Sequence, residues 1–335
     1  MIDDQHVTLA HGNGGRFMRE LIEEVFVRHL ANPELDIRCD AAYLPLPEGD
    51  VLVTTDGFTV QPLEFPGGDI GSLAVHGTVN DLAVAGAVPA YLSLNAFIEE
   101  GFEFERLNRL VTSMASAARE CGVRVAAGDT KVLRRGEGGG VYFATTGVGV
   151  RRPGLRLGVD RVREGDVILA SGPVGDHGTA VLLAREQFGL RGDLASDAAS
   201  VLPLTAALVE LPGLRFMRDP TRGGLATVMH EIARATGLCV RLDGPAIPIR
   251  APVLSVCEML GFDPLYLACE GRVVAVLAPE DAQSALDLWR ALPAGCDAAR
   301  IGVVRGGQSQ VILETELGGE RCLEELEDDP LPRIC

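Results

Sequence analysis

The chain has 335 residues, of which 47% are hydrophobic, and its formal net charge is −17. This length favours two domains over a single core. The negative charge argues against a nucleic-acid backbone or an anionic membrane as a partner, because both attract proteins rich in Lys and Arg.

The cysteines point to a reducing compartment. Eight of them are scattered along the chain without a CxxC spacing, which indicates free thiols and neither a disulfide framework nor a zinc site. No signal peptide is recognised before Leu9, and the longest apolar run, 82–97, is interrupted by Pro89. We therefore expect a cytoplasmic protein without a transmembrane helix.

In the first half of the chain, strands and helices alternate. Glycines and prolines mark most of the boundaries, and a Gly-Gly-Asp sequence starts the first long helix. We expect strands at 51–55, 91–97, 123–127 and 141–150, and helices at 69–87 and 103–121.

The second half repeats this alternation after a polar, turn-forming linker at 151–154. We expect strands at 166–171, 214–217, 239–242, 273–277 and 311–314, and helices from about 178 to 188 and at 220–236, 251–260 and 280–292. Two similar halves of this kind predict two α/β layers, although the pattern does not say whether the strands run parallel.

Five acidic residues stand where strands end or where apolar helices are interrupted. Glycine flanks several of them, and such carboxylates suit Mg²⁺, which prefers hard oxygen ligands and shares its other positions with phosphates. A magnesium site would also let this acidic protein tolerate a nucleoside triphosphate. The five are Asp56, Asp81, Asp129, Asp219 and Glu270.

Each carboxylate also has a structural explanation. Asp219 before Pro220 is the expected N-cap and N1 pair of a helix, and Asp56-Gly57 is typical of a turn. Asn80 and Asp81 are harder to explain, since they interrupt an apolar helix in which an unpaired carboxylate would be costly. For Asp81, an intrahelical contact and a ligand role both stay open.

Near the N-terminus, a glycine-rich segment precedes a helix that is expected to begin near Phe17. Its backbone N–H groups could approach a phosphate at the helix start. The segment is neither a Walker A motif nor a dinucleotide fingerprint, so a flexible arm is the alternative. It consists of His11, Gly12, Asn13, Gly14, Gly15 and Arg16.

Lys131 is the only lysine, because the other 29 basic residues are arginines. An ammonium binds phosphate as a point charge and can exchange a proton when its pKa shifts, whereas a guanidinium stays charged. This predicts a special site at Lys131, with a chance occurrence as the alternative.

The sequence ends on the thiol of Cys335. Eight acidic residues and one arginine lie between Glu314 and Asp329, and two prolines follow. Repulsion between like charges and the missing proline donors predict that the last dozen residues lie loosely on the surface. An extended tail of 13 residues from Leu323 could span ~45 Å, so the thiol could reach most sites on its own domain.

Together these motifs resemble the HypE family of hydrogenase maturation proteins, and the resemblance spans essentially the whole chain. The matching segments are Leu9–Arg16, 54–56, 77–82, 128–131, 175–178, 218–224, 270–272 and the terminal Pro-Arg-Ile-Cys335. Asn13 stands where a serine is expected in the arm.

The resemblance implies the ATP-dependent superfamily of aminoimidazole ribonucleotide (AIR) synthetase, selenophosphate synthetase and thiamine-monophosphate kinase, with the two-domain PurM-like α/β (α+β) fold. The N-terminal sheets of a homodimer would pair into a barrel. It implies an arm and helix at 1–38, an ATP-binding and dimerisation domain at 39–152, a C-terminal α/β domain at 153–322 and a mobile tail at 323–335.

The implied enzyme is an ATP-dependent carbamoyl dehydratase. A carbamoyltransferase of the HypF family would load Cys335, and dehydration would give a thiocyanate whose cyanide passes to iron on a HypC–HypD complex for a [NiFe]-hydrogenase. Glu270 would be the base, and Lys131 would neutralise the phosphoryl group or assist proton removal. The residues expected to bind ATP are His11–Arg16, Asp56, Asn80, Asp81, Asp129, Asp219 and Arg222, with Asp56, Asp81, Asp129 and Asp219 also expected to hold Mg²⁺.

Two alternatives stay open. Selenophosphate synthetases carry a reactive cysteine or selenocysteine near the N-terminus followed by lysine, whereas the first cysteine here is Cys39. A non-catalytic nucleotide-binding scaffold that docks through its tail is the second alternative, although a scaffold would not need the acidic set.

Overall fold

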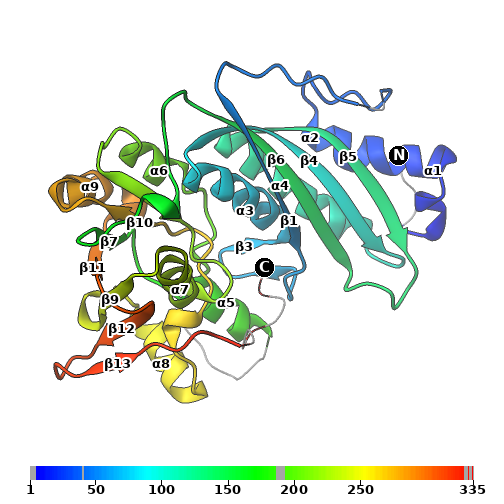
Figure 1. The fold of residues 1–335 in the computed structure, drawn as a ribbon. Helices are drawn as coiled ribbons and strands as arrows, with labels where there is room; N and C mark the ends of the chain where they lie inside the picture. Colours follow the sequence, from blue (N-terminus) through cyan, green and yellow to red (C-terminus); the bar gives the residue numbers. More distant parts are fainter. Residues whose placement is uncertain (1–4, 40, 186–192, 328–330, 332–333, 335) are drawn as a thin grey trace.

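The computed structural model describes residues 5–39, 41–185, 193–327, 331 and 334. Its two main sheets correspond to the two halves of the sequence (Figure 1). Among the described residues, no helix has both the length and the apolar character to cross a membrane.

The N-terminal half is built on a four-stranded sheet in the order β1-β6-β4-β5. Neighbouring strands are antiparallel except for β4 and β5, which are parallel. Helices α3 and α4 pack against each other and cover one face of this sheet (Figure 1). The strands are β1 (Asp50–Phe58), β4 (Ala87–Glu99), β5 (Arg124–Leu133) and β6 (Val141–Arg151), and the helices are α3 (Ile70–Val84) and α4 (Phe104–Cys121).

The N-terminal segment is helical and packs beside this sheet and α4. It consists of η1 (Leu9–Gly12), α1 (Gly15–Leu21), the π-helical turn η2 (Ile22–Val27) and α2 (Arg28–Leu30). A small hairpin of β2 (Glu64–Phe65) and β3 (Gly68–Asp69) leads into α3.

The C-terminal half is built on a seven-stranded sheet in the order β13-β12-β9-β11-β7-β10-β8. Its neighbouring strands β7 and β10 are buried along their whole length. The strands are β7 (Val167–Ala170), β8 (Leu214–Arg218), β9 (Cys239–Asp243), β10 (Val274–Leu277), β11 (Ala299–Arg305), β12 (Gln310–Glu314) and β13 (Glu320–Cys322).

The helices of this half surround the sheet (Figure 1). They are α5 (Asp176–Arg185), α6 (Leu202–Leu208), α7 (Gly224–Thr236), α8 (Ala251–Leu260) and α9 (Ala282–Arg290), with short 3₁₀ turns at η3 (Val159–Arg161), η4 (Gly244–Ala246), η5 (Pro264–Tyr266), η6 (Pro279–Asp281) and η7 (Pro293–Gly295).

Helix α3 carries part of the site and begins where its sequence predicts. The Asp69 carboxylate accepts the backbone N–H groups of Gly71 and Ser72 at 2.7 and 3.0 Å, which satisfies two of the free donors at a helix start. Most of its residues are buried, because the sheet, α4 and α6 pack around it. This burial explains the apolar sequence on all sides of the helix.

The tail differs from expectation. Composition predicts residues that lie loosely on the surface, yet Leu331 and Ile334 are 5% and 3% exposed and belong to the core that includes β2 and α5. The prediction is therefore wrong for these two residues, because two apolar side chains in an acidic segment are enough to anchor it. Cys335 lies outside the described residues.

Candidate active site

Four acidic side chains from both halves of the molecule line one small pocket. We call Asp56, Asp81, Asp219 and Glu270 the carboxylate cluster. The pocket has a volume of about 50 Å³ and is also lined by Gly57, Phe58, Gly77, Thr221 and Arg222. Asp56 comes from β1 and Asp81 from α3, whereas Asp219 follows β8 and Glu270 lies just before β10. The cluster thus forms where the two halves meet.

Burial and mutual repulsion govern the charges of the cluster. Burial raises the pKa of Asp56 to about 6, and the neighbouring Asp81 carboxylate adds to this rise. Burial also raises the pKa of Asp219 to about 7, again with a contribution from Asp81. The pKa of Glu270 lies well above its usual range because the side chain is buried and Asp219 is near. The cluster is thus poised to take up a cation or hold protons.

Glu270 is the member best suited to act as a base. Its side chain is 2% exposed, and its Oε1 atom has no hydrogen-bond partner in the described part of the chain. A buried carboxyl oxygen without a partner is costly unless it serves a ligand or a reaction. Its raised pKa makes Glu270 a stronger base than an exposed glutamate once it is ionised.

Two residues next to the cluster hold its backbone in place. Asn80 donates to the carbonyl oxygens of Ala199 and Glu270 at 3.0 and 3.1 Å and accepts the N–H of Val201 at 2.9 Å. Both of its amide hydrogens are engaged, so Asn80 has no donor left for a nucleotide and joins the two halves instead. Asp197 accepts the backbone N–H groups of Glu270 and Gly271 at 3.1 and 3.3 Å.

The donor chemistry of the cluster fits Mg²⁺, since several hard carboxylate oxygens with raised pKa values would be relieved by a cation. Within the described residues, however, no group of three or more acidic, His or Cys side chains forms a metal site by itself. Other oxygen ligands, such as those of a phosphate, would be needed to complete the coordination. The assignment of Asp56, Asp81, Asp129 and Asp219 as metal ligands stays a prediction.

Asp129 and Lys131 form a second group, the lysine pair, on β5. Lys131 Nζ lies 2.6 Å from Asp129 Oδ2, and both side chains are at least half exposed. This hydrogen bond lowers the pKa of Asp129, in contrast to the raised pKa values in the carboxylate cluster. The lone lysine thus neutralises an aspartate at the surface of this chain.

Strand register separates the two groups. Asp56 pairs with Thr145 on β6, whose hydroxyl donates to Ala74 of α3, so Asp56 lies on the helix-covered face. Asp129 pairs with Asn95 on β4, which pairs with Ala144 on β6, which in turn pairs with Gly57 on β1. Asp129 is therefore level with Gly57, the residue after Asp56. Since side chains alternate between faces, Asp129 points to the opposite face, and β5 is three strands or ~14 Å from β1. One chain therefore does not bring all the expected residues together.

The arm lies against the strand that carries the lysine pair. His11 is 1% exposed, its ring packs against Phe17 and Phe104, and its Nδ1 accepts the N–H of Thr8 at 3.1 Å. Gly12 is so close to β5 that an added Cβ would lie 2.7 Å from the Cβ of Val132. The arm is therefore a packed turn and helix start in this structure, and its role over phosphates stays a prediction.

Gly14 and Gly15 provide the turn between the two helical parts of the arm. Both have positive φ angles, 81° and 78°, a backbone conformation that residues with a side chain rarely adopt. With Asn13 and Arg16, they are the exposed part of the arm. Backbone N–H groups near this helix start could still approach an anion.

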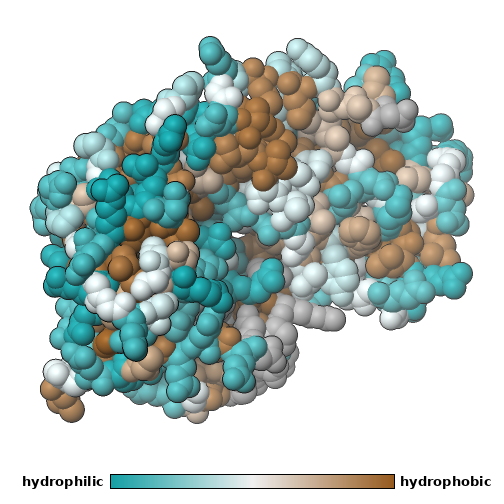
Figure 2. Space-filling model, in the orientation of Figure 1, coloured by the Kyte–Doolittle hydropathy of each residue, from teal (hydrophilic) through white to brown (hydrophobic). Residues whose placement is uncertain are grey.

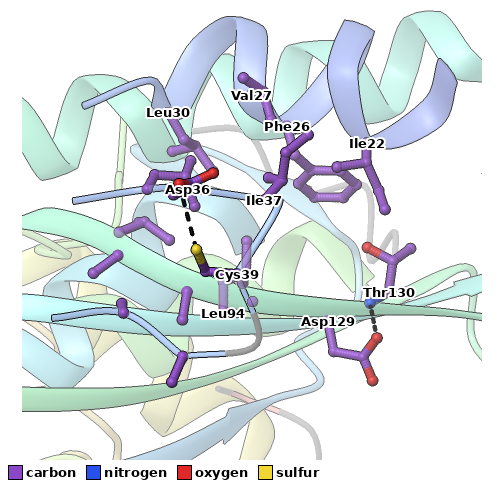
Figure 3. Close-up of a pocket in the computed structure, with 17 residues that line it drawn as sticks. Ile22, Phe26, Val27, Leu30, Asp36, Ile37, Cys39, Leu94, Asp129 and Thr130 are labelled. Atoms are coloured by element: carbon purple, nitrogen blue, oxygen red, sulfur yellow. Dashed lines mark hydrogen bonds between the residues drawn. The ribbon is translucent and has the colours of Figure 1, made fainter. Parts of the chain in front are cut away.

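An apolar pocket of about 200 Å³ also lies beside β5, away from the carboxylate cluster. Figure 3 shows Phe26 and Leu30 on its helical side, Leu94 on its sheet side and Cys39 in the loop that crosses it. The Cys39 thiol donates to Asp36 at 3.5 Å. The small carboxylate pocket contains the acidic chemistry, whereas this more apolar pocket is better suited to a flat ring.

Two family models match the chain, the AIR synthase related protein N-terminal domain at residues 38–151 and its C-terminal domain at 163–314. A protein of Azotobacter vinelandii named carbamoyl dehydratase HypE is 50% identical over 331 residues, which cover 98% of this chain and 97% of that protein. The chain belongs to the HypE family of carbamoyl dehydratases. The resemblance that the sequence motifs predict is thereby confirmed.

Solved HypE structures share the fold. A HypE in complex with ATP superposes with a TM-score of 0.94 at 45% identity, covering 98% of this chain and 99% of that one. A HypE from a HypE–HypF complex gives 0.81 at 41% identity, covering 91% and 99%. The PurM-like α/β fold is thus confirmed, while the exact domain boundaries and the residue roles stay predictions.

Two supporting residues were not identified from the sequence. Thr54 donates its hydroxyl to Asp81 at 2.7 Å, and its place in the Thr-Thr-Asp motif was a usable signal. Asp197 had none, because it lies in a loop far from Glu270 in the sequence. Arg222, which was expected, lines the pocket, and its charge partly offsets the rise in the pKa of Asp56.

Proposed function

We propose that this protein uses ATP to dehydrate a carbamoyl group on the thiol of Cys335 to a thiocyanate. Family membership supports the reaction type, and a relative named HypE has been solved with ATP. The observation that carries the proposal is the docked tail: Ile334, the neighbour of Cys335, is buried against α5, one loop away from Glu270. In this proposal the tail is the substrate, and the carboxylate cluster is where it reacts.

The chemistry requires a leaving group and a base. The carbamoyl oxygen attacks the γ-phosphorus of ATP, an O–P bond forms, ADP leaves, and nitrogen loses one proton. The C–O bond then breaks, phosphate carries the oxygen away, and nitrogen loses its second proton to give S–C≡N. Glu270 accepts a proton from this nitrogen. Lys131 offsets the charge on the transferred phosphoryl group or assists proton removal.

Asp56, Asp81 and Asp219 would hold Mg²⁺ with the phosphate oxygens, and Asp129 would join them. When bound, the ion would neutralise phosphate charge and orient the triphosphate. His11–Arg16 would cover the phosphates with backbone N–H groups and the Arg16 side chain. The apolar pocket beside β5 would take the purine ring.

A homodimer would bring the separated groups together. The helix-free face of the N-terminal sheet exposes apolar side chains, with Val51 and Val53 54% and 65% exposed, and Figure 2 shows apolar atoms gathered where β1 begins. Pairing of two such sheets into a barrel would cover this surface. The proposal requires that, in this arrangement, the lysine pair of one protomer reaches the carboxylate cluster of its partner.

The partners follow from the chemistry of the tail. A HypF-type carbamoyltransferase would load the thiol, in line with the solved HypE–HypF complex. A HypC–HypD complex would accept the cyanide for the iron of a [NiFe]-hydrogenase. All of these steps are expected in the cytoplasm, where ATP is available.

The intact mass of the protein tests this function. After incubation with the carbamoyltransferase, carbamoyl phosphate and ATP, we expect the peptide that ends in Cys335 to gain a carbamoyl group and then lose one water. A tail that is never modified would favour a scaffold. ATP cleavage with selenide and no change at Cys335 would favour a selenophosphate synthetase.

A further inference from the structure

A buried histidine holds the backbone of the penultimate residue. His177 at the start of α5 is 0% exposed, and its Nε2 lies 2.8 Å from the carbonyl oxygen of Ile334. Its other ring nitrogen, Nδ1, lies 2.7 Å from the hydroxyl oxygen of Ser196. The sequence motif around Gly175–Gly178 resembles the family without pointing to a task for His177.

The hydrogen-bond partners of His177 determine which of its ring nitrogens carries the proton. A carbonyl oxygen can only accept, so Nε2 carries the hydrogen and donates it to Ile334. Nδ1 is then the acceptor of the Ser196 hydroxyl hydrogen. Ser196 in turn accepts the backbone N–H of Ala198 at 2.9 Å. Burial lowers the pKa of His177, which agrees with a neutral ring in this relay.

The relay is held rigidly. The N–H of Ser196 donates to the carbonyl oxygen of Pro66 at 2.8 Å. The ring of Phe65 packs edge-on against His177 with centroids 5.4 Å apart. Gly67 lies so close to Ser196 that an added Cβ would be 2.7 Å from its carbonyl oxygen. The hairpin of β2 and β3 thus locks both members of the relay.

The same loop supports the proposed base. Asp197, which follows Ser196, accepts the backbone N–H groups of Glu270 and Gly271. The consecutive residues Ser196 and Asp197 therefore connect His177, which binds the tail, with the backbone of Glu270.

We propose that His177, oriented by Ser196, is the positioning residue that seats the C-terminal tail for dehydration. It recognises the main chain of residue 334, while Ile334 and Leu331 provide apolar anchors three residues apart. Because these contacts are few and local, the tail can be released without unfolding either half of the molecule. The claim that this docking serves dehydration of the modified thiol rests on the proposed function, whereas the docking of the tail on His177 does not.

The experiment compares His177→Leu with His177→Gln, which retains an N–H donor. The rate of N-ethylmaleimide labelling is measured by mass spectrometry on the peptide that ends in Cys335, with the exposed Cys39, Cys296 and Cys322 as internal standards. We expect His177→Leu to label the terminal thiol about ten-fold faster and His177→Gln to label near the wild-type rate, since a lost hydrogen bond of this kind is worth about ten-fold.

Activity gives the second readout. In protein that is already carbamoylated, His177→Leu should slow the first-order dehydration about ten-fold with an unchanged KM for ATP, and His177→Gln should restore most of the rate. His29→Leu, which removes a 2.7 Å contact with Asn108 remote from the tail, is the matched control. Ile334→Ala loosens the same dock from the tail side and leaves the folded domains unchanged, so it replaces His177→Leu if that variant does not fold.

Wild-type labelling in both His177→Leu and Ile334→Ala would overturn the docking of the tail on His177. Faster labelling with undiminished dehydration would overturn its role in catalysis. If the wild-type carbamoylated protein never loses water, the proposed function fails, and the labelling rates still decide whether His177 docks the tail.

Discussion

Asp219 and Asp129 are the same amino acid in opposite surroundings. Asp219 is buried between the two halves of the molecule near Asp81, and burial raises its pKa to about 7. Asp129 is exposed on β5, where the Lys131 ammonium lowers its pKa. A cation would therefore relieve the repulsion within the carboxylate cluster. The lysine pair has no net charge, and in it a phosphate could replace Asp129 as the partner of the Lys131 ammonium. Under the proposed function, the two groups would be complementary parts of one site.

The largest effect is expected inside the carboxylate cluster. Glu270→Gln removes the base and retains the shape, so ATP-dependent dehydration of a carbamoylated tail should fall by ~10² to 10⁴-fold while ATP binding stays intact. The measurement is single-turnover mass spectrometry with calorimetric ATP titration. Full turnover by this variant would exclude Glu270 as the base.

The next largest effect is expected from a change that disrupts the dimer and so separates the lysine pair from the carboxylate cluster of the partner. Val53→Asp places a charge on the exposed sheet face and should weaken dimerisation by at least ~100-fold, because a buried unpaired charge is costly. Sedimentation velocity measures this effect, and dehydration should be lost with the dimer. Leu317→Asp is the control, since Leu317 is 99% exposed on a turn. An active monomeric Val53→Asp protein would show that one chain suffices.

A smaller effect is expected at the lysine pair. Lys131→Arg keeps the charge and changes its shape and hydration, so dehydration should fall by ~10-fold. Lys131→Ala should reduce it further. Initial rates at saturating ATP measure both. Wild-type activity of Lys131→Arg would make the single lysine an accident of composition.

The smallest effect is expected on the free energy of unfolding, and it follows from the raised pKa of Asp219. An unfolded aspartate ionises near pH 4, whereas folded Asp219 holds its proton to about pH 7. The folded state thus binds more protons between these values, and its stability falls as the pH rises through this window. Asp219→Asn should raise the free energy of unfolding at pH 8 by ~1–3 kcal/mol and leave it almost unchanged at pH 4. Urea unfolding at both pH values tests this; an equal effect at both would contradict the shifted pKa.

The sequence predicted much of the fold because its signals are local. The start of α3 follows from the capping of Asp69, and the strand that carries Asp56 follows from its β-branched residues. The strands β2, β3, β11 and β13 and the helix α6 were not predicted, since they are held by neighbours distant in sequence. The tail was misjudged for the same reason.

The site was predicted in type but not in arrangement. Motifs identified Asp56, Asp81 and Glu270, and the structure places them around one pocket. Strand register, which sets Asp129 on the other face of the sheet, is not visible in a single sequence. The contacts by which Asn80 joins the two halves are hidden for a similar reason, since its partners lie more than 100 residues away in the sequence.

Mixing two inactive proteins tests most directly whether the two groups are halves of one site. Asp81→Asn chains lack an intact cluster and Lys131→Ala chains lack the lysine, so a mixed dimer would regain one site, formed by the wild-type cluster and the wild-type lysine of different chains. Random exchange should then restore about one quarter of the wild-type dehydration, with thiocyanate only on the Lys131→Ala chain, whose tail lies next to the intact cluster. No recovery in a verified mixed dimer would contradict the account.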